Sequence, residues 1–201
     1  MNKCGIICEY NPLHNGHVHQ MRAAKAINAY SALVCVMSGN FVQRGEGAAL
    51  NKFERARHAV LAGADVVVEL PAVFAVNSAQ DFAFGAVKLL DALNCNALHF
   101  GSEDGNIENL TAFADFLANP TAEFTGKLKK NLDRGLSYPA AVSQAADGVF
   151  PSNLLKSPNN ALAIEYLRAI KLLNSPMTPM TIKREDNYNL DGLTLDRKSV
   201  V

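Results

Sequence analysis

The chain has 201 residues, 49% of them hydrophobic, and its 19 basic and 19 acidic side chains give a formal net charge of zero. This composition supports a substantial buried core in one or two domains, and it argues against a chain that binds nucleic acid through overall positive charge. No apolar run approaches the length of a membrane span and no apolar leader precedes the first predicted strand, so we expect a cytoplasmic protein without a membrane segment.

The first hundred residues alternate between short apolar runs, which predict buried strands, and segments with apolar residues at helical spacing. In chain order we expect a strand at residues 4–10, a helix at 15–29, a strand at 32–37, a helix at 51–62, a strand at 65–70, a helix at 78–93 and a strand at 97–100. This alternation predicts an α/β fold, in which right-handed crossovers join the strands of a parallel sheet.

The pattern changes after about residue 104. Residues 106–147 predict helices separated by Asn119-Pro120 and by Gly135, and a polar link at 151–160 leads to a helix at 160–173. A last strand is expected at residues 180–183. We therefore expect one nucleotide-binding core that carries a helical insertion, rather than two independent domains.

The four cysteines lie in or beside these apolar runs, and no two of them form a C-x-x-C pair. We expect Cys4, Cys8, Cys35 and Cys95 to be buried, reduced thiols and to hold no metal. Zinc bound by the first two cysteines and the nearby histidines is disfavoured, because strand alternation at this spacing does not form the usual ligand knuckle.

The end of the first strand carries the pattern with the clearest chemistry. Pro12 ends the strand, and a helix begins a few residues later beside His14, Gly16 and His17. The free N–H groups and the positive dipole end of such a helix favour phosphate, Gly16 permits close approach, and the two imidazoles add donors. Alternatively, the two residues are a surface histidine and a helix-capping histidine.

Polar or glycine-rich residues follow all four early strands, where ligands bind in open α/β sheets. These strand ends are Glu9-Tyr10-Asn11, Ser38-Gly39-Asn40, Glu69-Leu70-Pro71 and Gly101-Ser102-Glu103. The signatures G-x-G-x-x-G, G-x-x-x-x-G-K-[ST] and G-x-S-x-G are all absent from the sequence. The common dinucleotide, P-loop and serine-hydrolase interpretations therefore lack their motifs.

The tetrapeptide His14-Asn15-Gly16-His17 resembles the HIGH signature of the superfamily of nucleotidyltransferases and class I aminoacyl-tRNA synthetases. Further blocks resemble, in the same order, the bacterial tRNA(Met) cytidine acetate ligases: residues 9–17, 37–46, 63–71, 100–103 and 158–160. The resemblance implies a Rossmann-like core with a parallel sheet. Its implied parts are a nucleotide-binding core at 1–104, a helical insertion at 105–157, and the end of the core with a truncated tail at 158–201.

The resemblance also implies an activity. Such enzymes use ATP to activate acetate, which gives acetyl-adenylate and pyrophosphate, and then acetylate the wobble cytidine of elongator tRNA(Met). The implied partners are ATP, acetate, elongator tRNA(Met) and Mg²⁺ held by the phosphates. Two alternatives remain: another HIGH-motif nucleotidyltransferase, such as an adenylyl- or cytidylyltransferase, or a non-catalytic module that binds nucleotide or RNA.

The resemblance assigns catalysis to His14 and His17. It assigns ATP binding to Ile7, Cys8, Glu9, Tyr10, Asn11, Pro12, Leu13, His14, Asn15, Gly16, His17, Val18, His19, Gln20, Gly101, Asn159 and Arg184. Candidates for contact with substrate or tRNA are Ser38, Gln43, Arg44, Lys52 and Arg55. Family members usually continue further, with a later Ser/Thr-and-Arg motif and a region that engages tRNA, so we expect ATP binding to be retained more readily than transfer to tRNA.

Some of these residues have other interpretations. Asn159 is also placed to cap the helix that follows it. Glu9 and Glu69 are direct catalytic acids, solvated loop residues or partners of Arg44. The segment 43–46 is alternatively a simple polar turn.

Overall fold

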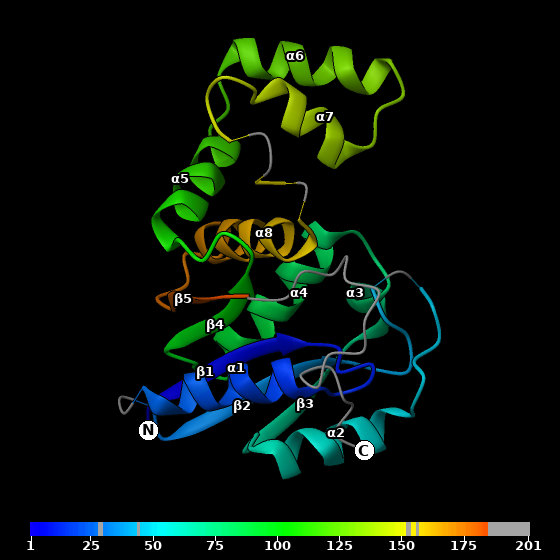
Figure 1. Ribbon diagram of the computed structural model, residues 1–201, viewed down its shortest axis with the longest axis vertical. Coiled ribbons are helices and arrows are strands. Elements are labelled where there is room, and N and C mark those ends of the chain that lie inside the picture. Colours follow the sequence, from blue (N-terminus) through cyan, green and yellow to red (C-terminus); the bar gives the residue numbers. More distant parts are fainter. Residues whose placement is uncertain (28–29, 44, 152–153, 156, 185–201) are drawn as a thin grey trace.

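The structure is a computed structural model that describes residues 1–27, 30–43, 45–151, 154–155 and 157–184. Its centre is a sheet of five parallel strands in the order β3-β2-β1-β4-β5 (Figure 1). The strands are β1 (Lys3–Cys8), β2 (Ala32–Ser38), β3 (Val66–Leu70), β4 (Ala97–Ser102) and β5 (Thr178–Lys183). The predicted α/β class and parallel Rossmann-like sheet are confirmed.

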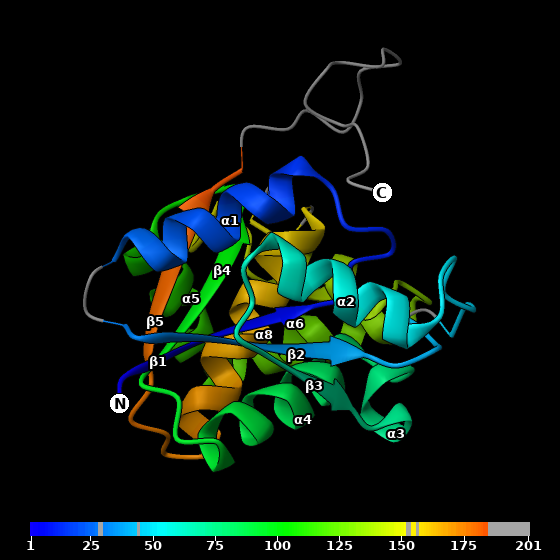
Figure 2. The ribbon, with the colours of Figure 1, turned by 90° about the horizontal axis from the view of Figure 1, so that it is seen from below.

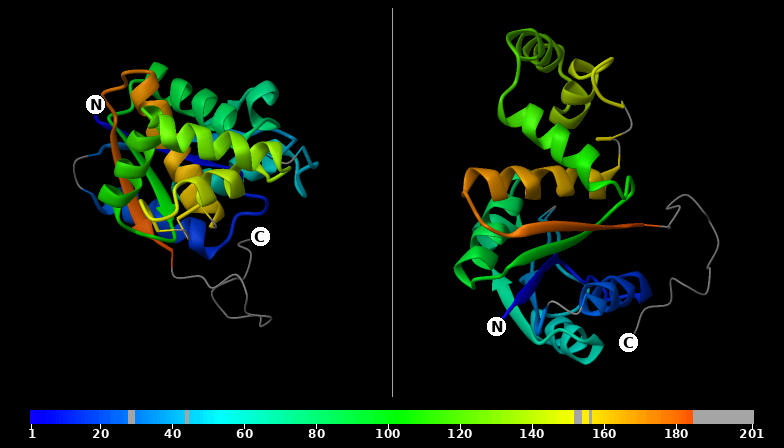
Figure 3. Two further views of the ribbon diagram at one scale, coloured as in Figure 1. Left: turned by 90° about the horizontal axis from the view of Figure 1, so that it is seen from above. Right: turned by 90° about the vertical axis from the view of Figure 1, so that its left-hand side faces the viewer.

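Helices cover both faces of the sheet (Figures 2 and 3). One face carries α1 (Asn15–Ala26) and α2 (Lys52–Ala62), and the other carries α3 (Ala72–Ala75), α4 (Ala79–Ala92) and α8 (Pro158–Leu172). Beyond α8 lies a further layer, formed by α5 (Ile107–Ala118), α6 (Ala122–Asp133) and α7 (Tyr138–Ala145). No helix in the described part of the chain is long and apolar enough to cross a bilayer.

The sheet is buried on both faces, which explains why its strands read as continuous apolar runs. Along β1, Cys4 and Ile6 join the apolar cluster under α1 and α2, whereas Ile7 packs against the cluster under α4 and α8. Gly5 also faces that second cluster, and a Cβ built there would lie 2.7 Å from the Leu90 side chain. The close approach of α4 to the sheet therefore depends on a glycine at this position.

The layer of α5, α6 and α7 shares the second cluster. Leu110, Phe113 and Val142 are buried there together with Ile164 of α8. Each such side chain stabilises the fold by about 1.5–3 kcal/mol on burial. The predicted insertion thus packs on the core through α8, as an additional helical layer.

Most predicted elements lie within two or three residues of those observed, and the predicted helix breaks at Asn119-Pro120 and Gly135 are confirmed. The first strand ends at Cys8 rather than at residue 10, because Tyr10 adopts a left-handed backbone with φ 47°. Helix α8 begins at Pro158, two residues before its predicted start at residue 160, and the short helix α3 was not expected. All four cysteines are buried and free, as predicted.

Candidate functional site

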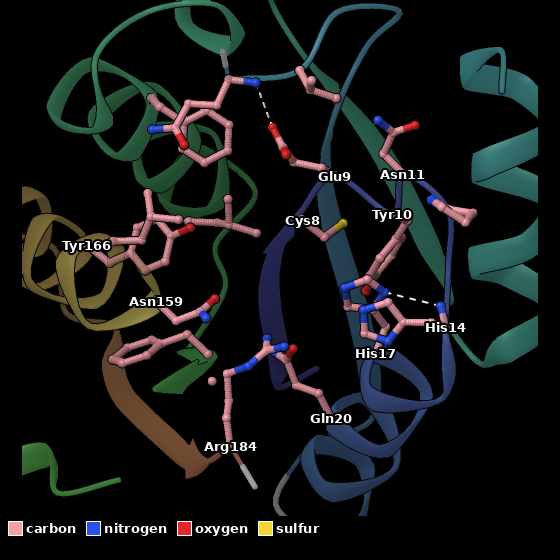
Figure 4. Close-up of a pocket in the computed structure, with 18 of the residues that line it drawn as sticks. Cys8, Glu9, Tyr10, Asn11, His14, His17, Gln20, Asn159, Tyr166 and Arg184 are labelled. Atoms are coloured by element: carbon pink, nitrogen blue, oxygen red, sulfur yellow. Dashed lines mark hydrogen bonds between the residues drawn. The ribbon is translucent and has the colours of Figure 1, made fainter. Parts of the chain in front are cut away.

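A cavity of about 450 Å³ opens at the carboxyl edge of the sheet, where β1 and β4 end and where α1 and α8 begin (Figure 4). Five chain segments and one side chain of α4 form its wall. The lining residues are Ile7, Cys8, Glu9, Tyr10, Asn11, Pro12, His14, His17, Gln20, Val42, Gln43, Glu46, Phe82, Phe100, Gly101, Asn159, Leu162, Tyr166 and Arg184. The predicted site at the ends of the strands thus coincides with a cavity.

The two histidines cap α1 and line the cavity at the same time. His14 is the N-cap, and its Nδ1 accepts the N–H of Gly16 at 3.1 Å. The Nδ1 of His17 in turn accepts the N–H of His14 at 3.3 Å, which completes a capping box. A neutral imidazole whose Nδ1 accepts a hydrogen bond carries its proton on Nε2. The caps therefore assign an Nε2–H donor to each ring.

The imidazole of His17 is neutral because it is buried against neighbouring rings. The ring centroids of His14 and His17 lie 3.6 Å apart with an interplanar angle of 24°, and Tyr10 packs against His17 at 4.9 Å. Burial, together with the smaller effects of His14 and Arg184, lowers the pKa of His17 to about 3. At neutral pH His17 is thus a neutral hydrogen-bond donor rather than a cation.

The prediction that free N–H groups at the start of α1 face a phosphate is wrong for two of them. The N–H of Gly16 donates to the His14 ring, and the N–H of His17 donates to the His14 carbonyl at 2.9 Å. These two N–H groups are already hydrogen-bonded within the cap. Helix α1 therefore acts on the cavity through the imidazoles of His14 and His17 and through its dipole.

The carboxylate of Glu9 ties the loop after β2 to the end of β1. Its Oε1 accepts the backbone N–H of Gln43 at 2.7 Å and lies 3.4 Å from the Ser38 hydroxyl (Figure 4). Ser38 itself is completely buried and does not line the cavity, which contradicts its predicted contact with substrate or tRNA. Gln43 lines the cavity, whereas Arg44 lies outside the described residues. Glu9 therefore shapes the wall of the cavity through a backbone contact.

The prediction that Arg55 contacts tRNA phosphate is also wrong. Its side chain is only 1% exposed, and its donors go to backbone carbonyls: Nε to Leu50 at 3.1 Å, Nη2 to Ser38 at 3.0 Å and to Gly39, and Nη1 to Glu9. These carbonyls belong to the ends of β1 and β2 and to the start of α2. Arg55 is thus a structural clamp behind the cavity.

Lys52 is exposed enough to remain a candidate for contact with tRNA, but it is paired. Its ammonium lies 2.6 Å from a carboxylate oxygen of Glu69, and both side chains are on the surface outside the cavity. Glu69 is therefore the partner of a lysine in the described structure. A Cβ built at Gly39 would lie 2.4 Å from the Glu69 carboxylate, so this carboxylate lies against the backbone of the loop after β2.

On the opposite side of the cavity, α8 and the chain after β5 contribute polar groups. The amide nitrogen of Asn159 donates to Glu103 at 2.7 Å, and the N-cap of α8 is Ser157, so the alternative role of Asn159 as a cap is wrong. Arg184 follows β5 and packs on Gly101, where a Cβ would lie 3.2 Å from its side chain. Asn159, Gly101 and Arg184 all line the cavity, as the predicted ATP site requires.

Five residues of the predicted ATP segment do not line the cavity. Leu13 is buried in the core under α1, and Val18 packs against that core; Asn15 and His19 are exposed, and Gly16 serves the cap. The helical period explains this result, since consecutive residues of a helix face in different directions.

The sequence analysis missed the lining residues Val42, Glu46, Phe82, Phe100, Leu162 and Tyr166. Phe82 and Phe100 were indistinguishable from core residues. For α8, however, a signal was available, because Leu162 and Tyr166 follow Asn159 by three and seven residues on one helical face. Within the described ranges, no group of three or more His, Cys, Asp or Glu side chains is arranged to bind a metal ion.

Comparison with known proteins assigns the chain to a family. The family described as HIGH Nucleotidyl Transferase matches residues 1–199. The tRNA(Met) cytidine acetate ligase of Clostridium novyi is 45% identical over 200 residues, which cover 96% of this chain and 50% of that protein. The corresponding protein of Caldanaerobacter subterraneus is 46% identical over 189 residues, which cover 92% and 47%.

A solved structure matches as well. The crystal structure of Thermotoga maritima TmcAL bound with alpha-thio ATP superimposes with a TM-score of 0.85 at 38% identity, over 92% of this chain and 47% of that chain. The chain thus spans about half the length of the curated relatives that it matches.

Proposed function

Because this chain belongs to the HIGH nucleotidyl transferase family, we propose that its cavity binds ATP and activates acetate as acetyl-adenylate. The acetyl group is then transferred to the wobble cytidine of elongator tRNA(Met). The observation that carries this proposal is the pair of capped imidazoles, which present Nε2–H donors at the cavity. The names of the relatives, and the alpha-thio ATP bound to the Thermotoga maritima protein, support the choice of ligand and reaction.

In the first step, a carboxylate oxygen of acetate attacks the α-phosphorus of ATP. A new phosphorus–oxygen bond forms, the bond from the α-phosphorus to the bridging oxygen breaks, and pyrophosphate leaves with the electron pair. Negative charge builds on the phosphoryl oxygens during this exchange. Neutral donors fixed in advance, such as the Nε2–H of His17, stabilise that charge without reorganising.

In the second step, the exocyclic amine of the cytidine attacks the acetyl carbon. A carbon–nitrogen bond forms, AMP leaves with the electron pair of the broken carbon–oxygen bond, and the amine loses a proton. Lys52 and Gln43 are our candidates for contact with tRNA. Gln43 lines the cavity in the loop after β2, and Lys52 lies on the surface where the helix after that loop begins. Ser38 and Arg55 are no longer candidates because they are buried.

Mg²⁺ would enter this site with ATP, bound to phosphate oxygens and water, and would neutralise part of the triphosphate charge. The chain's own contribution is the cationic Arg184 and the two imidazole donors. These groups would position the nucleotide through charge-assisted hydrogen bonds to its phosphates.

The test is acetate-dependent exchange of pyrophosphate into ATP with Mg²⁺, measured on the wild type and on a His14→Ala/His17→Ala variant. We expect exchange that requires acetate and that the double substitution abolishes. Exchange that ignores acetate but needs a phosphorylated acceptor would indicate an adenylyl- or cytidylyltransferase. Tight ATP binding without any exchange would indicate a non-catalytic nucleotide-binding module.

A further inference from the structure

Opposite the histidines, an apolar part of the cavity wall lies beside the polar side chains of Asn159 and Arg184. We call it the apolar wall, and it consists of Ile7, Cys8, Phe82, Phe100, Leu162 and Tyr166. In Figure 4, Tyr166 lies across the cavity from His14 and His17, with Cys8 between them. Phosphates and a ribose do not need such a surface, so two parts of the proposed substrates remain for it: the adenine ring of ATP and the carboxylic acid.

The hydroxyl of Tyr166 is the one oxygen on this wall. The side chain is only 6% exposed, its ring packs against Phe100 with centroids 5.8 Å apart, and its hydroxyl is directed into the cavity (Figure 4). Tyr166 makes no hydrogen bond to the other residues that the structure describes, and its hydroxyl is not among the fully buried polar atoms. A phenol hydroxyl that opens into a cavity in this way can donate to a ligand bound there.

The state of this hydroxyl decides which ligand it suits. Burial raises the pKa of Tyr166, and the nearby charges of Glu9 and Cys8 raise it further, so the phenol keeps its proton at any physiological pH. The apolar wall therefore offers one hydrogen-bond donor inside an apolar surface. A carboxylate only accepts hydrogen bonds, whereas adenine also needs an acceptor for its amino group.

We propose that the apolar wall binds the carboxylic acid substrate and restricts it to a short chain. The Tyr166 hydroxyl donates to one carboxylate oxygen, and the methyl group packs against Phe82, Phe100 and Leu162. The other carboxylate oxygen then faces the phosphates beside the imidazoles. This inference rests on the proposed function, and it adds the residues that select the acid.

The first test is Tyr166→Phe, with Tyr138→Phe as the matched control, because Tyr138 is 46% exposed on α7 and far from the cavity in sequence and layer. Removal of one hydroxyl that has no protein partner leaves the fold intact. We expect the KM for acetate in the exchange reaction to rise about tenfold, since a hydrogen bond to a charged group is lost. The Kd for ATP should stay within about twofold of the wild type.

The second test enlarges the wall with Leu162→Ala. We expect the ratio of kcat/KM for propionate to that for acetate to rise about tenfold, which is the usual discrimination for one methylene. A loss of activity with both acids at an unchanged ratio would mean that the wall does not select the acid.

A binding readout separates this inference from the proposed function. Broadening of the [¹³C]acetate NMR signal by the protein with bound alpha-thio ATP needs no turnover. If wild-type exchange is absent but broadening requires Tyr166, the proposed activation fails and the acid site stands. If exchange occurs but Tyr166→Phe changes neither broadening nor the KM for acetate, the acid site fails. An equal loss of affinity for ATP and acetate would assign the wall to the nucleotide, and would also overturn the inference.

Discussion

Helices α1 and α2 both begin at the carboxyl edge of the sheet, and each is capped by a side chain at its start, yet their first turns serve different purposes. At α2, Asn51 accepts the N–H groups of Phe53 and Glu54 at 3.0 Å, which is an ordinary cap. At α1, two histidines form the cap and also reach the cavity. The less usual capping residues are on the helix that faces the cavity.

The charged groups of the two first turns follow the same division. Arg55 of α2 directs its guanidinium inward, to carbonyls of β1, β2 and the preceding loop. The first turn of α1 contains no acidic or basic side chain that is charged at neutral pH, and its buried imidazole is neutral. One helix start therefore holds the edge of the sheet together, and the other offers uncharged donors to the site.

The difference between the two helix starts can be tested by substitution, and the largest loss of stability is expected at Arg55. We expect Arg55→Ala to lower the free energy of unfolding by about 3–5 kcal/mol, because several buried carbonyls lose their donor and each lost contact costs about 1–3 kcal/mol. Urea denaturation of the purified chain measures this. Arg57→Ala is the control, since Arg57 is exposed and pairs only with Glu54 at 3.7 Å, and we expect less than about 0.5 kcal/mol. Similar losses of unfolding free energy for the two variants would contradict the structural role of Arg55.

Next in size is the effect of His17→Ala on the proposed reaction. We expect acetate-dependent pyrophosphate exchange to fall about 10²–10³-fold, the usual loss when one fixed donor to a developing anion is removed. The free energy of unfolding should fall by only about 1 kcal/mol, for the lost cap. His19→Ala serves as the control because His19 is exposed and outside the cavity, so exchange should stay within about twofold.

The neutral imidazole also predicts a pH dependence of stability. The pKa of His17 is about 3 in the folded chain against an ordinary value of 6.5, so the unfolded chain binds the proton more readily. Stability is therefore complete above pH 6.5 and is lost as the pH falls towards 3. Because the ring is partly open to solvent, we expect the wild type to lose on the order of 2 kcal/mol more than His17→Asn between about pH 6.5 and 4.

That comparison is made by urea denaturation at each pH value. Asn51→Ala is the matched variant at α2, and its pH slope should equal that of the wild type. Equal slopes for the wild type and His17→Asn would contradict the neutral, buried state of His17.

The smallest expected effect is that of the ordinary cap. We expect Asn51→Ala to lower the free energy of unfolding by about 1 kcal/mol and to leave exchange within about twofold of the wild type. Asn51→Asp should restore the stability, because a carboxylate also accepts the two N–H groups. A large loss of exchange with Asn51→Ala would mean that the two helix starts do not divide the tasks as described.

Much of the fold was predictable because its signals are local. Strands buried on both faces must be apolar along their whole length, and the helices between them repeat apolar residues at helical spacing, so each element could be recognised from a short window. The site was predictable where it follows the end of a strand, as at Glu9 and His14. Along α8 the signal was ambiguous, because Leu162 and Tyr166 share a helical face with Asn159 but also have the spacing of ordinary core residues.

The predictions for Arg55 and for Gly16 were wrong for the same reason. Arg55 was expected to meet RNA, because an arginine in the first turn of a helix is usually solvated. Gly16 was expected to meet a phosphate, because its N–H lies at a helix start. In both cases the predicted donor is satisfied within the protein, by carbonyls in one case and by a histidine ring in the other.

The sequence by itself determined the order of strands and helices and the place of the imidazole pair, since hydrophobic period, proline and capping residues act over a few neighbouring positions. Only the tertiary structure decided that Arg55 reaches the carbonyl of Glu9, 46 residues earlier in the chain, and that Tyr166 faces the histidines across a cavity. Such contacts depend on how the sheet brings distant strand ends together, and no local pattern records which side chains then meet.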